Sequence, residues 1–161
     1  MPRKLSDLDP KRGLLGFSLR LPIWVYRIHL GWLLGNRFLM LTHTGRISGR
    51  SIQTVLEVVS HDRQTNTYTI ASGWGENSDW YKNITKNNRV VVTTKNGRFE
   101  AMAMRLSVEE ARQIFLDYAH KHPLAFRELV GLMGGLRQAS DEQNSNILAQ
   151  TIPLFSLKPS L

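Results

Sequence analysis

From residue 37 onward, the helical spacing of apolar residues gives way to short stretches rich in Leu, Ile, Val, Thr and Tyr, which are typical of β-strands. These predicted strands cover residues 37–44, 51–60, 67–71, 89–95, 98–105 and 152–157. Asn96-Gly97 is the strongest short-range hairpin signal, because both residues tolerate positive φ. Consecutive hairpins and a late closing strand predict an antiparallel barrel, since closure removes exposed sheet edges.

Capping signals predict the helices that flank this barrel. Ser78 is a good N-cap for a short helix through Ile84, and Ser107 with Glu110 forms a capping box that opens a helix to about Lys121. Residues 123–133 suit a further helix that begins at a proline. Residues 137–150 are polar and give little signal, so no element is predicted there.

The N-terminal third is an apolar arm with interspersed arginines. Arg20, Arg27 and His29 interrupt residues 14–34 before the roughly 20 clean positions that a membrane-spanning helix needs. The helical spacing predicts an amphipathic arm that docks on the domain's own core, and a peripheral membrane contact through residues 11–34 stays open as the alternative. We therefore expect one domain, with residues 1–36 as its basic arm and residues 37–161 as the barrel.

The net charge of +8 is concentrated in this first third. Residues 1–50 hold nine basic and two acidic residues, whereas the remainder is almost balanced. A basic arm with one anion-binding loop fits this distribution better than a nucleic-acid binder does. The chain has no cysteine, which excludes disulfides and thiol nucleophiles, and we see no secretory signal. We therefore expect a cytoplasmic protein.

The connection THTGRISGR, residues 42–50, combines hydroxyls, glycines and two arginines at the end of a predicted strand. Glycines allow backbone N–H groups to turn toward an anion, hydroxyls donate hydrogen bonds, and the arginine fork matches phosphate or carboxylate oxygens. The composition fits a phosphate-binding turn. A plain polar hairpin turn with solvated arginines fits it equally well.

A second stretch, ASGWGENSDWYKN at residues 71–83, opens from a strand end into a glycine-flanked turn and then a helix with two adjacent aromatic residues. Glycines permit close backbone approach, and aromatic faces can stack on a flat heteroaromatic ring. The competing interpretation is that Trp80 and Tyr81 are core aromatics, and we expect this of one of the two.

Together THTGRxSG, TVLEVV, ASGWGENSDWYKN and NNRVVV occur in one order and spacing. In this the chain resembles the deazaflavin-dependent nitroreductase and quinone reductase family, over about residues 14–130 and in the IPLFSL strand. The resemblance implies an FMN-binding-like split antiparallel β-barrel with flanking helices, which binds the deazaflavin coenzyme F420. FMN on the same barrel is the alternative cofactor. The family often has basic residues at the position of Ile47 and, after the turn, at that of Ile52 or Gln53, and Asn88 replaces its usual proline.

The resemblance also implies a cofactor-binding set. The residues that would face the phosphate or acidic tail are Arg46, Ser48, Gly49 and Arg50. The residues that would border the ring are Thr54 and Val55. Backbone contacts would come from Ser72, Gly73, Trp74 and Gly75. The residues that would fix the loop are Trp80, Tyr81 and Asn83.

The activity implied is hydride transfer from the reduced deazaflavin to an apolar quinone or nitroaromatic, with a small molecule as the partner and a homodimer left open. Tyr118, His120 and His29 are available proton donors, but none is assigned as catalytic. The histidines show no HExxH spacing, so we expect no metal site. A non-enzymatic lipid-surface protein is the alternative from another class.

Overall fold

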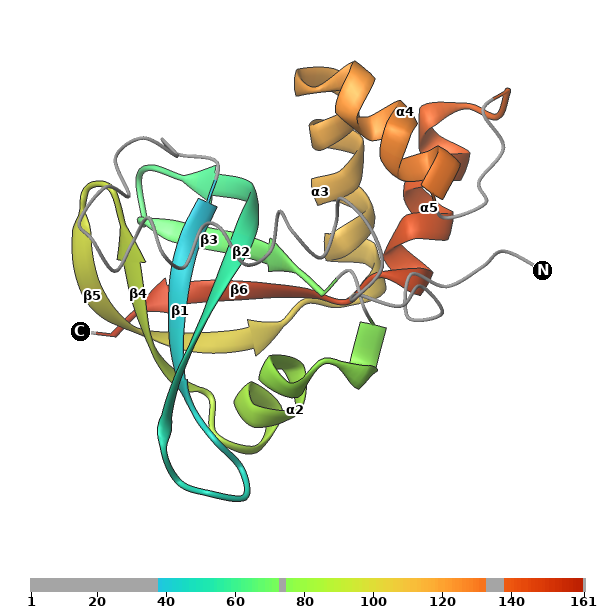
Figure 1. Ribbon diagram of the computed structural model, residues 1–161. Helices are drawn as coiled ribbons and strands as arrows, with labels where there is room; N and C mark the ends of the chain where they lie inside the picture. Colours follow the sequence, from blue (N-terminus) through green and yellow to red (C-terminus); the bar gives the residue numbers. More distant parts are fainter. Residues whose placement is uncertain (1–37, 73–74, 133–137, 161) are drawn as a thin grey trace.

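The computed structural model describes residues 38–160 except 73–74 and 133–137, and within these residues six strands close into an antiparallel barrel (Figure 1). The strands are β1 (Phe38–Thr44), β2 (Ser51–Asp62), β3 (Thr67–Ala71), β4 (Arg89–Thr94), β5 (Gly97–Arg105) and β6 (Leu154–Pro159). Their order around the barrel is β1-β2-β3-β6-β5-β4, and β4 pairs with β1 to close it. The predicted barrel is confirmed.

The closing strand begins two residues later than the sequence predicted. Proline has no N–H to donate to a strand ladder, and Pro153 lies just before β6. Its carbonyl accepts a hydrogen bond of 2.9 Å from the backbone N–H of Ser72. This contact joins the end of β3 to the start of β6, where the second sequence motif begins.

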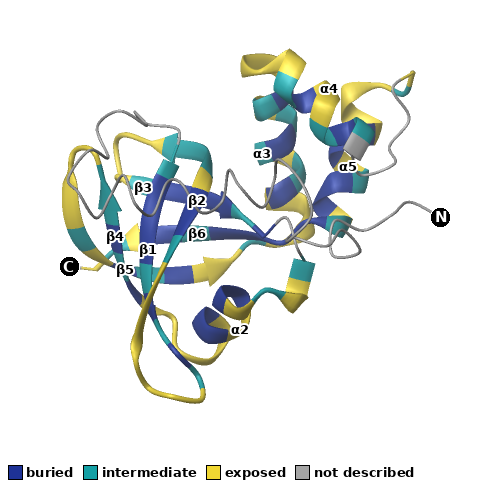
Figure 2. Ribbon diagram, in the orientation of Figure 1, coloured by how far each residue is buried: buried dark blue, intermediate teal, exposed yellow. Residues whose placement is uncertain are grey.

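The barrel interior is an apolar core built by alternation along the strands. Leu39, Leu41 and His43 on β1 are buried, whereas Thr42, between Leu41 and His43, is only half-buried. The core cluster is completed by residues of the other strands and of one helix; buried residues are dark blue on the ribbon in Figure 2. Because apolar burial contributes about 25 cal/mol per Å², this cluster is a major source of the fold's stability.

Helix α2 (Asp79–Lys86) covers one end of the barrel. Trp80, Tyr81 and Ile84 on its inner side belong to the same core cluster as the strands. The ring of Phe155 on β6 lies 6.0 Å from that of Trp80 and 5.3 Å from that of Tyr81, both edge-on. The predicted helix is confirmed. Its packing against the barrel positions the short segment that precedes it in the chain.

Three further helices pack together beside the barrel: α3 (Val108–Lys121), α4 (Pro123–Leu132) and α5 (Asp141–Thr151). They bury a second apolar cluster that includes Phe115, Phe126 and Leu148. The sequence predicted α3 and α4 but not α5. Helix α5 begins with a capping box between Ser140 and Gln143, a signal that was present in the sequence although the helix is polar.

The N-terminal arm, residues 1–36, lies outside the described residues, so its place in the domain and its membrane contact remain predictions. Within the described residues, no helix combines the length and the apolar character that crossing a bilayer requires.

Candidate functional site

The turn at residues 45–50 is a tight closure between β1 and β2. The Gly45 N–H donates to the Arg50 carbonyl at 2.8 Å, and the Gly49 N–H donates to the Gly45 carbonyl at 2.9 Å. Gly49 has a φ of +68°, a backbone conformation that residues other than glycine rarely adopt. The side chain of Ile47 is 90% exposed at the tip. The turn therefore presents its outer surface to solvent.

Arg46 ties this turn to α2. Its backbone N–H and its Nη1 both donate to Asn83 Oδ1, each at 3.0 Å, and its Nη2 lies 3.1 Å from Asp79 Oδ1. From the same helix, Lys86 Nζ donates to the Arg46 carbonyl at 3.0 Å. The Arg46 guanidinium is thus engaged with side chains of α2, so its structural contribution is to hold the turn in place.

Asn83 is the centre of a buried polar network. The side chain is 2% exposed, and two N–H groups of Arg46 point at Oδ1, which assigns the other amide atom, Nδ2, as the donor. Nδ2 lies 3.2 Å from Nδ1 of His43, so this nitrogen is the acceptor and the neutral ring carries its proton on Nε2. His43 Nε2 then donates to Thr54 Oγ1 at 3.1 Å.

This network predicts a pH-dependent stability. Burial lowers the pKa of His43, and the charge of Asp79 offsets this only in part. A folded-state pKa below the unfolded value means that the unfolded chain takes up the proton first, so stability should fall as the pH falls through about 6.5. Urea unfolding at pH 7.5 and 5.5 should show this loss in the wild type.

The matched variants separate His43 from other titrating groups. His43→Asn keeps an oxygen that can accept from Asn83 Nδ2, and the loss of stability between pH 7.5 and 5.5 should become smaller. His120→Asn, which changes an exposed histidine on α3, should retain the wild-type loss. An unchanged pH dependence in His43→Asn would contradict the neutral tautomer.

The bend that follows β3 leads directly into α2. Ser72 is buried, and its hydroxyl donates to the Gly75 carbonyl and lies 3.1 Å from the Ser78 hydroxyl. Gly75 has a φ of +66° and opens a short 3₁₀ turn, η3 (Gly75–Asn77). Ser78 is at the predicted N-cap position, but its hydroxyl faces Ser72 instead of capping the helix. Gly73 and Trp74 lie outside the described residues.

A charged cluster stands beside this bend. Arg105 Nη1 donates to Tyr81 Oη at 2.7 Å and lies 3.1 Å from Glu76 Oε1, and the Tyr81 hydroxyl in turn lies 3.4 Å from Glu76. Burial is the main cause that raises the pKa of Tyr81, and Arg105 opposes the rise. The phenol therefore keeps its proton at neutral pH. No pattern in the sequence singled out Arg105 or Glu76.

The structure brings several predicted site residues together and separates others. Arg46 and Asn83 are in direct contact, and Thr54 joins them through His43. Val55 pairs with Met40 and belongs to a separate apolar cluster, on the opposite face of β2 from Thr54. Trp80 and Tyr81 are both core aromatics, where the sequence analysis expected this of one of the two.

The turn at 45–50 and the bend at 72–78 meet the same helix. The bend runs into the N-terminus of α2, and the turn is bound at Asp79 and Asn83. Because a helix rises 1.5 Å per residue, Ser78 and Asn83 are separated by only about 7.5 Å along the axis. His43 is the network member that sequence analysis missed. The signal for it was its position on the predicted strand: His43 continues the every-second-residue pattern of the buried Leu39 and Leu41.

Helix α3 carries two of the proton donors considered from the sequence. Tyr118 packs beside His122, with ring centroids 5.1 Å apart, and His120 is exposed. His29 lies outside the described residues. No group of three or more potential metal ligands occurs in the part of the chain that the structure describes.

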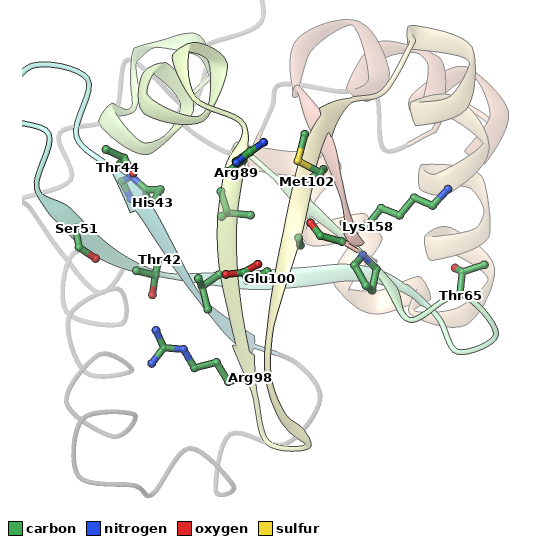
Figure 3. Close-up of a pocket in the computed structure, with 15 residues that line it drawn as sticks. Thr42, His43, Thr44, Ser51, Thr65, Arg89, Arg98, Glu100, Met102 and Lys158 are labelled. Carbon is green, nitrogen blue, oxygen red and sulfur yellow. The ribbon is translucent and has the colours of Figure 1, made fainter.

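A separate, open cavity of about 890 Å³ lies on the outside of the barrel, over β1, β4, β5 and β6 (Figure 3). We call it the outer groove. It reaches the base of the 45–50 turn at Thr44 and Ser51, and His43 also borders it. None of the described residues predicted from the sequence to bind the cofactor lines it.

A closed antiparallel barrel with the 45–50 turn held against its end helix has the FMN-binding-like split-barrel fold. The sequence profile of one protein family matches residues 19–127. The chain belongs to the F420H(2)-dependent quinone reductase family. This confirms the resemblance found from the sequence motifs and makes F420 the cofactor.

Solved structures share the fold at low sequence identity. An F420-H2 dependent reductase, FDR-A, has a TM-score of 0.52 and 20% identity over 76% of this chain and 94% of its own. A conserved hypothetical protein from Mycobacterium tuberculosis has a TM-score of 0.55 and 12% identity over 83% of this chain and 80% of its own. No curated protein matches the chain.

Proposed function

We propose that this chain transfers a hydride from reduced F420 to a quinone or nitroaromatic compound, at a site formed by the 45–50 turn and the 72–78 bend. The observation that carries the proposal is the bonding of Arg46 to Asn83 and Asp79, which holds the turn on the helix that begins at the bend. Two segments that are separated by 21 residues of sequence thereby meet one short helix. We place the reaction in the cytoplasm.

The turn fits the charged part of the cofactor. Arg50 is exposed, and its guanidinium makes no ion pair with any residue in the described ranges. The Ser48 hydroxyl accepts from the Arg50 N–H at 3.2 Å, which leaves the hydroxyl proton to donate outward. We assign Arg50 and Ser48 to the phosphate and Arg46 to holding the turn, which refines the set implied by the resemblance.

The bend fits the ring. Gly75 adopts its positive φ beside an exposed turn, so backbone can approach a flat ligand there. When bound, F420 supplies the hydride. The protein orients the ring against the end of the barrel and holds a proton on Tyr81 Oη beside the bend, next to Arg105. A quinone or nitro oxygen that gains charge during reduction would be stabilised by such donors.

The test is a titration of the purified full-length chain with F420, followed by turnover of reduced F420 with menadione. We expect quenching of F420 fluorescence at micromolar concentrations and loss of reduced cofactor only when the quinone is present. FMN in a parallel titration should bind more weakly. Binding of FMN alone, or no binding of F420 at high micromolar concentration, would overturn the proposal.

A further inference from the structure

The outer groove carries more positive than negative charge, and its charges come from three adjacent strands. Arg89 on β4, Arg98 on β5 and Lys158 on β6 line it, with Glu100 on β5 as the acidic residue among its described lining. All four side chains belong to exposed residues. An aqueous groove with this balance attracts anions.

The strand register places two of the cations in one row. Arg89 pairs with Met102, and Met102 pairs with Lys158. Directly paired residues project from the same face, so the two cations flank Met102 across three strands, as Figure 3 shows. Neighbouring strands are about 4.8 Å apart, which puts the Cα atoms of Arg89 and Lys158 about 10 Å apart.

Arg98 extends this row along β5. It lies four residues from Met102, and alternate residues of a strand share a face, so Arg98, Glu100 and Met102 all face the groove. At about 3.3 Å per residue, Arg98 lies about 13 Å from Met102 along the strand. The cations therefore surround Glu100 instead of clustering at one point.

None of these four side chains forms an ion pair within the ranges that the structure describes. Some surface charges elsewhere are paired, as Arg112 with Glu109 and Lys121 with Asp117 show. Three unpaired cations facing one groove repel one another. A ligand with anionic groups at matching spacing would relieve this repulsion.

We propose that the outer groove binds a small polyanion, a ligand with two or more carboxylate or phosphate groups. Arg89 and Lys158 hold groups that are about 10 Å apart, and Arg98 holds a third. Glu100, between them, repels any anion, so its charge weakens the binding. The site goes beyond the proposed reductase function. Its ligand is either the acidic end of a cofactor bound at the adjacent turn or a free polyanion.

Calorimetric titration of the full-length protein with sodium triphosphate, and separately with triglutamate, tests the groove itself. We expect binding that weakens as salt is raised. Arg98→Gln and Lys158→Gln should each weaken it about two- to fivefold, as exposed charge pairs do. Glu100→Gln should strengthen it by a similar factor, a gain that damage to the fold would not produce.

Lys121→Gln is the matched control, because it removes an exposed cation on α3, away from the groove. It should leave binding unchanged, and thermal melting should show all variants folded. The proposal is overturned if neither probe binds at low salt. It is also overturned if Arg98→Gln and Glu100→Gln leave the affinity as it is in the wild type.

Titration with F420 distinguishes the two sources. If the acidic end of the cofactor occupies the groove, triglutamate should compete with F420, and Arg98→Gln should weaken F420 binding. If the ligand is a free polyanion, Arg98→Gln should bind F420 as the wild type does, whereas its affinity for triphosphate should fall. F420 binding without any binding of the probes overturns only the groove, whereas probe binding without F420 overturns only the reductase function.

Discussion

Asn83→Ala should lower the free energy of unfolding by about 2–4 kcal/mol, because it leaves several buried polar groups without partners. The Arg46 N–H loses its acceptor, and Nδ1 of His43 loses its donor. Cofactor affinity should fall as well, since the turn is no longer held on α2. Urea unfolding and F420 titration measure the two effects.

Two further variants sharpen this prediction. Lys82→Ala changes an exposed position of the same helix and should stay within about 0.5 kcal/mol of the wild type. Asn83→Asp keeps an acceptor for Arg46 but turns a carboxylate toward His43, so the pKa of His43 should rise relative to the wild type. If Asn83→Ala is as stable as Lys82→Ala, the network does not support the turn.

Arg50→Ala should weaken F420 binding about ten- to hundredfold, because a hydrogen bond to a charged group is worth about 1.5–3 kcal/mol. The melting temperature should not change, since the Arg50 side chain is exposed and unpaired within the described residues. Arg46→Ala should lower the melting temperature, from the loss of its bonds to α2, and should weaken F420 binding only through the loosened turn.

Arg63→Ala is the control for Arg50, because it removes an exposed arginine from the β2–β3 turn. Its F420 affinity should equal that of the wild type. Fluorescence titration at one ionic strength compares the three arginine variants. An Arg50→Ala affinity within twofold of the wild type would contradict the assignment of Arg50 to the phosphate.

The barrel was predictable because its strands carry strong local signals. The Asn96-Gly97 turn and the buried alternation of Leu39 and Leu41 each determine strand position without help from distant residues. The helix α5 was missed because a polar helix shows little apolar periodicity, although its capping box was visible. Local chemistry thus determined most elements and their order.

The candidate site was only partly predictable, because its geometry depends on contacts between distant residues. The sequence marks Arg46 as an anion ligand by residue type, but only the fold shows that Asn83, 37 residues later, accepts its hydrogen bonds. Similarly, the row of Arg89, Met102 and Lys158 exists only through strand register. Residue types indicate chemistry, and pairing decides which of them act together.

Amide hydrogen exchange of the full-length protein with and without oxidised F420 tests the central claim most directly. If the cofactor lies between the turn and the bend, peptides covering residues 45–50 and 72–78 should both gain protection on binding. Peptides from α3 should exchange as before. Saturating F420 with no added protection in either segment would contradict the placement of the site.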